Sequence, residues 1–374
     1  MDRSDLSAAK RLVIKIGTSS ITHDSGKLNL MKMELLAREI ADLHNRDIQV
    51  ILISSGAVGA GVGTLDYNGP MQTLPIRQAL AAVGQGTLMQ MYEKFFSEYG
   101  KKVAQILLTR DLFDDRLKYL NARNTLLSLL DLGVIPIINE NDTVAVEELR
   151  FGDNDTLSSM VASTVNADLL VILSDIDGLY DSDPRKVHNA RLLSEVTEIT
   201  GDMEEKSKTK GSTMSSGGMY TKLIAAKMAM ASGIPMVIAD SGERNILRKI
   251  VDGEKKGTMF IPGVDGIQAR KYWIAFGSLS HGKVRIDKGA YDAIKKKGKS
   301  LLPSGVLEVR GNFDKGTVIS IIYGNREIAK GITNYSSGEI DAIRGRHSDE
   351  IEELLGFKDY DEVIHRDNMT VKEA

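Results

Sequence analysis

The sequence predicts an α/β protein: a three-layer sandwich around a mostly parallel sheet, followed by a small β-rich domain. Up to about residue 262, apolar runs of strand length alternate with helical patterns. The runs are continuous rather than alternating, as in Gln-Val-Ile-Leu-Ile at 49–53, which is typical of strands buried on both faces of a parallel sheet. Beyond 261–263 (Ile-Pro-Gly), short strands and turns replace this pattern.

The first part contains six expected strands and five expected helices. The strands are expected at 11–16, 48–54, 102–108, 134–138, 168–174 and 235–239. The helices are expected at 30–46, 74–98, 117–131, 154–166 and 217–232. Ligands of such sheets bind outside the carboxyl ends of the strands, where the polar, glycine-rich segments of this sequence are expected to lie. These segments are 17–20, 54–63, 139–155, 174–184 and 211–222.

The change of pattern near residue 262 sets the expected domain organisation. We expect a first domain over 1–262, a linker over 263–279 and a β-rich domain over 280–357. A highly charged tail over 358–374 is expected to be loosely held.

Composition excludes several classes of function. The chain has 374 residues, 42% of them hydrophobic, and a net charge of −3, so we expect no general attraction to nucleic acid or anionic membranes. It has no cysteine, which excludes disulfides, thiolate catalysis and cysteine-bound zinc. The N-terminus is polar and no apolar run reaches about 18 residues, so a signal peptide and a membrane span are not expected. A cytoplasmic protein is the expectation.

A lysine lies inside the first apolar strand. Lys15 is the fifth residue of the run at 11–16, and Gly17 follows the run directly. A buried ammonium needs an anion nearby. Gly17 lets the backbone approach that anion and donate its amide to it. We therefore infer a phosphate site at the end of this strand. The alternative is a lysine whose ammonium reaches solvent at the strand end.

A second candidate anion site opens the helix expected at 217–232. The segment before it, 201–216, lacks periodicity, and we expect a mobile loop there. Two glycines at a helix start leave amide donors at the positive end of the helix dipole. Lys222 falls about one turn inside and can reach the same anion; the alternative is a solvated lysine. The candidate residues are Ser216, Gly217, Gly218, Met219, Tyr220, Thr221 and Lys222.

Three further polar segments follow strands. Residues 54–56 (Ser-Ser-Gly) offer hydroxyls and amides. Residues 139–142 and 152–155 flank one loop and suit a small zwitterion, since a carboxylate can hold an ammonium while amides and hydroxyls hold a carboxylate. The alternative for the second of these is helix N-capping. Ser174 and Asp175 suit a nucleotide's sugar and base, or belong to a simple turn.

In this order the segments resemble the amino acid kinase family, and within it the members that phosphorylate free glutamate and carry a C-terminal PUA domain. The most specific matches are at 15–19, 55–57, Gln85 within 81–86, 139–142, 152–155 and 216–222. In the second part, 300–305 and 311–313 resemble the PUA module. Family members commonly have threonine where this chain has Ser174 and Ser216, and the position of Tyr220 is variable.

The resemblance implies a role for each candidate. Lys15 and Lys222 would be catalytic, holding the transferring phosphoryl group from two sides, and Asp155 would orient them. The amides of Gly17, Gly56 and Gly218 would add donors. Glutamate would be bound by Ser55, Gly56, Asp142 and Asn154. ATP would be bound by Lys15, Gly17, Ser174, Asp175 and residues 216–222. Mg²⁺ would be carried on the phosphates of ATP rather than by protein side chains.

The implied reaction is phosphorylation of the γ-carboxylate of L-glutamate, the first step of proline biosynthesis. A carboxylate with a reference pKa of about 4.3 is ionised at neutral pH and needs no general base. The site must instead bring one anion up to another, which two lysines, helix-start amides and magnesium allow. The resemblance also implies inhibition by proline, a homo-oligomer (dimer or tetramer) and coupling to a glutamyl-phosphate reductase.

Two alternatives stay open. Another kinase with the same fold, acting on acetylglutamate, carbamate, aspartate or a nucleoside monophosphate, would use the same phosphate machinery. The second alternative is an RNA-binding protein, since PUA modules often bind RNA. The basic run Lys295-Lys296-Lys297 is more simply a solvated helix face, so RNA binding is the weaker alternative.

Overall fold

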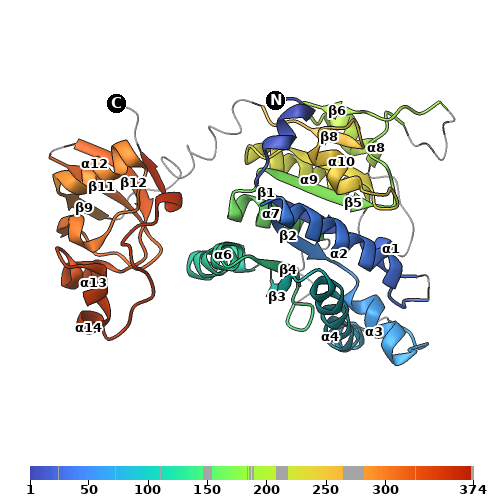
Figure 1. Cartoon of the computed structure of the whole chain (residues 1–374), viewed down its shortest axis with the longest axis horizontal. Coiled ribbons are helices and arrows are strands. Elements are labelled where there is room, and N and C mark those ends of the chain that lie inside the picture. The colour runs from blue at the N-terminus through green and yellow to red at the C-terminus, as the bar shows by residue number, and fades with distance from the viewer. Residues whose placement is uncertain are drawn as a thin grey trace. The chain divides into compact units, whose positions relative to one another are not determined.

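The computed structural model describes residues 1–23, 25–71, 73–109, 111–145, 154–182, 184, 187, 189–207, 218–263, 282–324 and 326–371. The chain divides into two compact units, Met1–Ile267 and Gln268–Ala374, and each is described by itself (Figure 1). Among the residues described, no helix has the length and apolar character needed to cross a membrane. Parts of the sequence that carried expectations lie outside the described ranges. They are the expected linker apart from its first residue, and 146–153, 183 and 211–217 of the polar segments, which include Gly152, Asp153, Ser216 and Gly217.

An eight-stranded sheet forms the centre of the first unit, in the order β3-β4-β2-β1-β5-β7-β8-β6. Its strands are β1 (Arg11–Ile16), β2 (Gln49–Ser54), β3 (Lys102–Leu108), β4 (Val134–Glu140), β5 (Leu169–Ser174), β6 (Glu195–Val196), β7 (Met236–Asp240) and β8 (Thr258–Phe260). All neighbouring pairs run parallel except β7 with β8. The mostly parallel sheet is confirmed. The sequence analysis missed β6 and β8, which are too short to leave a pattern.

Helices cover both faces of this sheet and make the three layers (Figure 1). One core cluster joins alternate strand residues to α2 (Leu30–Asn45), α4 (Leu74–Glu98) and α10 (Ile246–Val251). The other cluster joins the remaining strand residues to α6 (Arg116–Asp131), α7 (Asn154–Val165) and α9 (Met219–Ala231). Strands β1, β2 and β5 are buried along almost their whole length because both of their faces are covered.

Among the described residues of the first unit, five short helices were not expected: α1 (Thr18–Ile21), α3 (Ala57–Leu65), α5 (Asp111–Asp114), α8 (Gly201–Ser207) and α10. The expected loop at 201–216 is therefore wrong over its first seven residues, and 208–216 lie outside the described part. Helix α8 carries an ion pair one turn apart, between Lys206 and Asp202 at 2.8 Å, and Met203 packs on the core. These contacts stabilise a segment that has no periodic pattern in the sequence.

Helix α3 forms despite its glycines because it packs directly on α4. A Cβ atom on Gly84 of α4 would lie 1.8 Å from the carbonyl oxygen of Ala57, and one on Gly61 of α3 would lie 1.9 Å from that of Leu80. The backbones of the two helices therefore touch, which only glycine permits. Tertiary packing overrides the low helix propensity of glycine here, and it brings α4 close to the end of β2.

The second unit has its own sheet and core. The strand order is β10-β9-β11-β12-β13. The strands are β9 (Gly282–Ile286), β10 (Val306–Arg310), β11 (Val318–Tyr323), β12 (Arg326–Ile332) and β13 (Met369–Val371). The helices are α12 (Lys288–Lys297), α13 (Ser337–Ile343) and α14 (Ile351–Leu355). This unit is β-rich, as the sequence analysis expected.

The charged tail differs from the expectation of a loosely held segment. Val363 and Ile364 are 0% exposed and belong to the core of the second unit. Leu301 pairs with Ile364 through an isolated bridge, and β13 pairs antiparallel with β12. These few apolar residues are surrounded by charged residues in the sequence, which predicts a solvent-exposed tail. In the structure the tail instead supplies the edge strand β13.

Candidate active site

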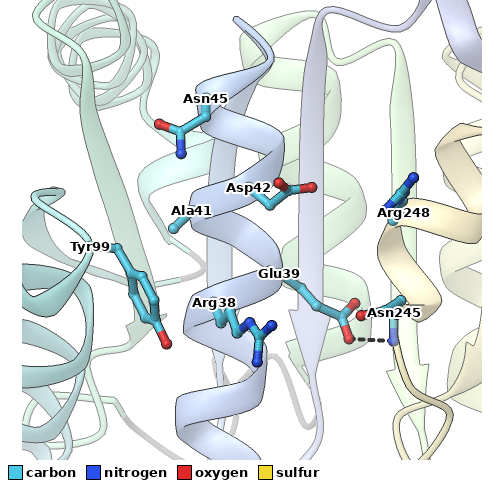
Figure 2. A pocket seen from close by; sticks show the side chains of 8 residues that line it. All are labelled: Arg38, Glu39, Ala41, Asp42, Asn45, Tyr99, Asn245 and Arg248. Carbon is cyan, nitrogen blue, oxygen red and sulfur yellow. Dashed lines mark hydrogen bonds between the residues drawn. The ribbon is translucent and has the colours of Figure 1, made fainter.

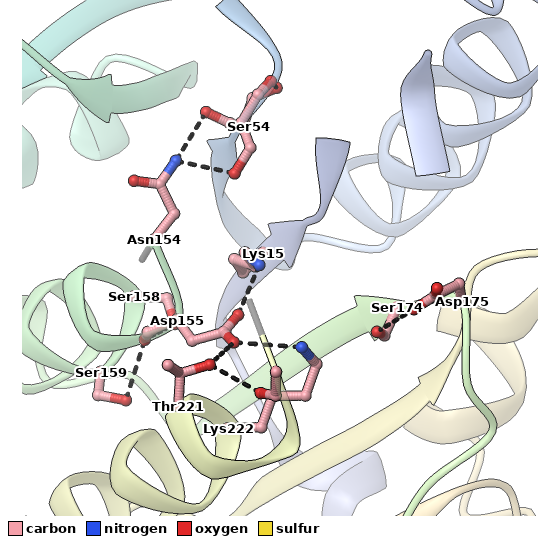
Figure 3. Close-up of polar contacts among 12 residues, drawn as sticks. Lys15, Ser54, Asn154, Asp155, Ser158, Ser159, Ser174, Asp175, Thr221 and Lys222 are labelled. Carbon is pink, nitrogen blue, oxygen red and sulfur yellow. Dashed lines mark hydrogen bonds and ion pairs between the residues drawn. The ribbon is translucent and has the colours of Figure 1, made fainter. Parts of the chain in front are cut away.

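One buried carboxylate joins two lysines from distant parts of the chain. Lys15, on β1, places its Nζ 2.5 Å from Asp155 Oδ1, and Lys222, on α9, places its Nζ 3.3 Å from Asp155 Oδ2 (Figure 3). All three side chains are buried, Asp155 completely. The structure thus brings together the two lysines and the aspartate that the sequence analysis singled out.

Local structure explains how the three side chains meet. Asp155 lies in the first turn of α7, where the helix dipole favours a negative charge. Ser159 of α7 donates to the carbonyl oxygen of Ala225 at 2.8 Å and so ties α7 to α9. Thr221 Oγ1 lies 3.0 Å from Asp155 Oδ2 and 2.8 Å from the carbonyl oxygen of Gly218. The first turn of α9 is therefore fixed against Asp155, and Lys222 follows it.

The described members of this cluster carry more positive than negative charge. Lys15, Lys222 and Asp155 together have a formal charge of +1, and all three are buried. Removal of the charges from water strengthens their attraction and makes an uncompensated charge costly. Two ammonium groups held close together in this way can both donate charge-assisted hydrogen bonds to phosphate oxygens.

Three glycines begin helices at this edge of the unit, and none of these helices is capped by a side chain. They are Gly17 before α1, Gly56 before α3 and Gly218 before α9. Gly56 has a φ of +98°, which side chains disfavour. The amide of Gly17 points to the carbonyl oxygen of Leu173 at 3.4 Å, so it extends the pairing of β1 with β5. Gly56 and Gly218 fit the expected role of amide donors better than Gly17 does.

A second polar cluster surrounds Asn154, the residue before Asp155. Asn154 Nδ2 lies 3.2 Å from the carbonyl oxygen of Ser54 (Figure 3). It also lies 3.0 Å from Ser55 Oγ and 2.9 Å from Asn139 Oδ1. Asn139 Nδ2 donates in turn to Gln85 Oε1 at 2.9 Å. Ends of β2, β4 and α7 therefore meet at this cluster, and two of its members, Ser55 and Asn154, were expected substrate ligands.

Four members of this network were not among the individually assigned site residues. Ser54 and Asn139 belong to the expected polar segments, Gln85 belongs to a segment that resembles the family, and Tyr92 was not singled out. Ser54 Oγ lies 2.8 Å from the hydroxyl of Tyr92, which is fully buried. Burial raises the pKa of Tyr92 well above its usual value, so the phenol stays protonated. The sequence did contain a sign that Gln85 and Tyr92 act together. They are seven residues apart and therefore share one face of α4.

The remaining candidates lie around these two clusters. Ser174 ends β5 and is buried, and its hydroxyl donates to the exposed Asp175 at 3.0 Å. Met219 and Tyr220 are half-buried in the first turn of α9. Asp142 lies partly exposed in the turn after β4, and the contacts given above do not include it.

A separate hollow of about 350 Å³ lies along the outer face of α2 (Figure 2). It is lined by Arg38, Glu39, Ala41, Asp42, Asn45, Tyr99, Asn245 and Arg248, none of which was a candidate. Glu39 accepts from the backbone amides of Asn245 at 2.7 Å and Leu247 at 3.0 Å. Burial raises the pKa of Glu39, and these two amides oppose that shift. Its carboxylate therefore serves as a cap for α10.

Comparison with known proteins places this geometry in context. Residues 10–240 match the Amino acid kinase family, and residues 282–355 match the PUA domain. The glutamate 5-kinase of Caldanaerobacter subterraneus subsp. tengcongensis is 52% identical over 364 residues, which cover 97% of this chain and 98% of that protein. The glutamate 5-kinase of Moorella thermoacetica is 53% identical over 99% of this chain and 98% of its own length. That of Syntrophotalea carbinolica is 48% identical over the full length of both.

Proposed function

This chain belongs to the amino acid kinase family, and we propose that it transfers the γ-phosphoryl group of ATP to the side-chain carboxylate of L-glutamate. The observation that carries the proposal is the placement of two adjacent residues at the start of α7. Asp155 holds Lys15 and Lys222, while Asn154 holds Ser55. A phosphate-binding cluster and a cluster suited to a zwitterion thus share one helix start.

The chemistry needed at such a site is positioning and charge compensation. The attacking carboxylate is already ionised, and its approach to a phosphoryl group is opposed by repulsion. Lys15 and Lys222 would hold the equatorial oxygens of the transferring group from two sides, and Asp155 would keep the two ammonium groups in place. The amides of Gly56 and Gly218 would supply further donors.

The choice of glutamate among the possible acceptors rests on the names of the relatives. The cluster of Lys15, Asp155 and Lys222 would suit any of these acceptors. Curated proteins that match this chain over almost its whole length at about half identity bear the name glutamate 5-kinase. We propose that the substrate is held by Ser55, Gly56, Asp142 and Asn154. In this reading the product is glutamyl 5-phosphate, an intermediate of proline biosynthesis.

The nucleotide side and the regulation of the enzyme belong to the same proposal. ATP would be bound by Lys15, Ser174, Asp175 and the start of α9, with Mg²⁺ carried on its phosphates. Because the product is a labile acyl phosphate, a reductase that consumes it would be a natural partner. Inhibition by proline and assembly into a dimer or tetramer extend the proposal.

A substrate panel tests the proposed function. The purified full chain is incubated with Mg²⁺, ATP and one acceptor at a time: glutamate, acetylglutamate, aspartate, carbamate or UMP. ATP consumption is measured with a coupled ADP assay, with and without proline. We expect kcat/KM for glutamate to exceed that of each other acceptor by at least about 100-fold, because a site built to pair polar groups rejects ligands that leave them unpaired. A higher value for another acceptor would overturn the proposal.

A further inference from the structure

Two polar side chains of α4, Gln85 and Tyr92, contact residues of the candidate active site. The proposed function gives a role to neither. Gln85 is 9% exposed and Tyr92 is 0% exposed. Gln85 Oε1 accepts from Asn139 Nδ2 at 2.9 Å, and the hydroxyl of Tyr92 lies 2.8 Å from Ser54 Oγ. Gln85 therefore contacts, through Asn139, the network that includes the expected substrate ligands Asn154 and Ser55.

A backbone amide fixes the orientation of the first asparagine in this network. The amide of Glu140 can only donate, and it lies 2.9 Å from one terminal atom of Asn139, so that atom is the oxygen. Asn139 Nδ2 then faces Gln85, which must present its own oxygen. Each amide group in this pair has one orientation that satisfies its partners.

A backbone carbonyl fixes the second asparagine in the same way. The oxygen of Ser54 can only accept, so the atom of Asn154 that lies 3.2 Å from it is the nitrogen. The same nitrogen faces Ser55 Oγ and Asn139 Oδ1. Asn154 Oδ1 therefore points away from these three acceptors, and no donor within the described ranges forms a hydrogen bond to it.

We propose that Gln85 is a positioning residue: through Asn139 it holds the amide of Asn154 with its oxygen toward the bound amino acid. This inference rests on the proposed function and deepens it. Asn154 Oδ1 accepts a hydrogen bond from the α-ammonium of the substrate. The hydroxyl of Ser55 accepts from Asn154, which leaves its own proton for a carboxylate of the substrate.

Gln85 matters because Asn139 is almost fully buried, at 3% exposure. Without the oxygen of Gln85, one proton of Asn139 Nδ2 would lose its acceptor in a site with little water. A buried donor without a partner costs free energy. Rotation of the Asn139 amide would not help, because its nitrogen would then face the donors of Glu140 and Asn154. Loss of Gln85 should therefore disorder the acceptor that recognises the ammonium.

Two substitutions at Gln85 separate hydrogen bonding from packing. Gln85→Met keeps the side-chain volume and removes the acceptor. Gln85→Ala removes the volume, but a water molecule can enter and accept from Asn139. A role in hydrogen bonding predicts that Gln85→Met raises KM for glutamate more than Gln85→Ala does, whereas a role in packing predicts the reverse. Gln90→Met is the matched control, because Gln90 lies on the same helix and is exposed.

The steady-state kinetics of each variant are measured with glutamate and with glutarate, which lacks the ammonium. We expect Gln85→Met to raise KM for glutamate by about tenfold. KM for ATP and for glutarate should change by less than about threefold. The thermal midpoint of Gln85→Met should fall by only about 2–10 °C, as expected for one unpaired buried donor. The ratio of kcat/KM for glutamate to that for glutarate should therefore fall, and Gln90→Met should leave it unchanged.

Equal losses with glutamate and glutarate, no loss with either, or a greater loss for Gln85→Ala than for Gln85→Met would overturn the positioning role. Wild-type turnover of glutamate is measured alongside. If the wild type does not phosphorylate glutamate, the proposed function fails and the positioning role fails with it. If the wild type does phosphorylate glutamate, the kinetics of Gln85→Met alone decide whether Gln85 is a positioning residue.

Discussion

Lys15 Nζ lies 2.5 Å from Asp155 Oδ1, and both side chains are withdrawn from solvent. The carboxylate at the start of α7 thereby fixes an ammonium at the end of β1. The other oxygen of Asp155 contacts Lys222 from α9. One residue therefore sets the positions of two charges that are far apart in the sequence of the first unit. Changes at Asp155 should therefore act on both lysines together.

Asp155→Asn keeps the shape of the side chain and removes its charge. The two ammonium groups then repel each other without a carboxylate between them, so the clamp on the phosphoryl group should open. We expect kcat to fall on the order of 100-fold or more. The free energy of unfolding, measured with urea, should also fall by about 3 kcal/mol or more, since a buried charge loses its partner. Asp202→Asn, on the exposed face of α8, is the control and should leave kcat within about twofold.

Lys222→Met tests the clamp directly. The substitution preserves the aliphatic stem and removes the ammonium, so turnover should fall by about 100- to 1,000-fold while the circular dichroism spectrum stays unchanged. Lys227 lies on the same helix, is about half exposed and pairs with Glu204, so Lys227→Met should retain nearly full turnover. Near-normal turnover of Lys222→Met would refute its role.

Asp142→Ala tests the assignment of the carboxylate in the turn after β4. Removal of a group that holds the substrate ammonium should raise KM for glutamate by about tenfold or more and leave KM for ATP unchanged. Asp131→Ala, at the exposed end of α6, is the control. An unchanged KM for glutamate in the Asp142 variant would remove this residue from the proposed site.

Gly84→Ala tests the contact of α3 with α4. The new methyl group would meet the carbonyl oxygen of Ala57 at 1.8 Å, so the helices must separate, at a cost of about 1–3 kcal/mol in the free energy of unfolding. Gly86 is on the same helix and has nothing within 4 Å of an added Cβ. Gly86→Ala should stabilise the protein by about 0.5–1 kcal/mol. Opposite signs for two identical substitutions, measured by urea unfolding, are the expected result.

Ile364→Ala tests the attachment of the tail. The side chain is 0% exposed in the core of the second unit, so its truncation should destabilise that unit by about 2–5 kcal/mol. Leu354→Ala, at a position 44% exposed, should have a much smaller effect. A loosely held tail would instead give equal thermal midpoints for the two variants.

The sequence was most informative where a pattern repeats or where a charge lies in an apolar run. Continuous Val/Ile/Leu runs located six strands to within about two residues, and Lys15 stood out because it interrupts one of them. It was uninformative where stability comes from contacts between distant segments. Helix α3 depends on the close approach of Gly61 and Gly84 to neighbouring backbone, which its glycine-rich sequence does not reveal.

The residues of the candidate site also divide into those that a sequence pattern reveals and those that depend on contacts between distant segments. Lys15, Asp155 and Lys222 were found because each lies beside glycines or polar residues at the end of an element. Gln85 belongs to a recognisable segment, yet its role depends on its distance to Asn139, which sequence spacing cannot give. Tyr92 lies within a helical pattern and outside every candidate segment, and it was found only through the 2.8 Å contact with Ser54.

The most direct test of the central claim is the identity of the product. Hydroxylamine added to a reaction of the wild-type chain with glutamate, ATP and Mg²⁺ converts an acyl phosphate into a hydroxamate, which is identified by mass spectrometry. Phosphoryl transfer to the glutamate side chain predicts γ-glutamyl hydroxamate in amounts equal to the ADP formed. ADP formation without this hydroxamate would contradict the account.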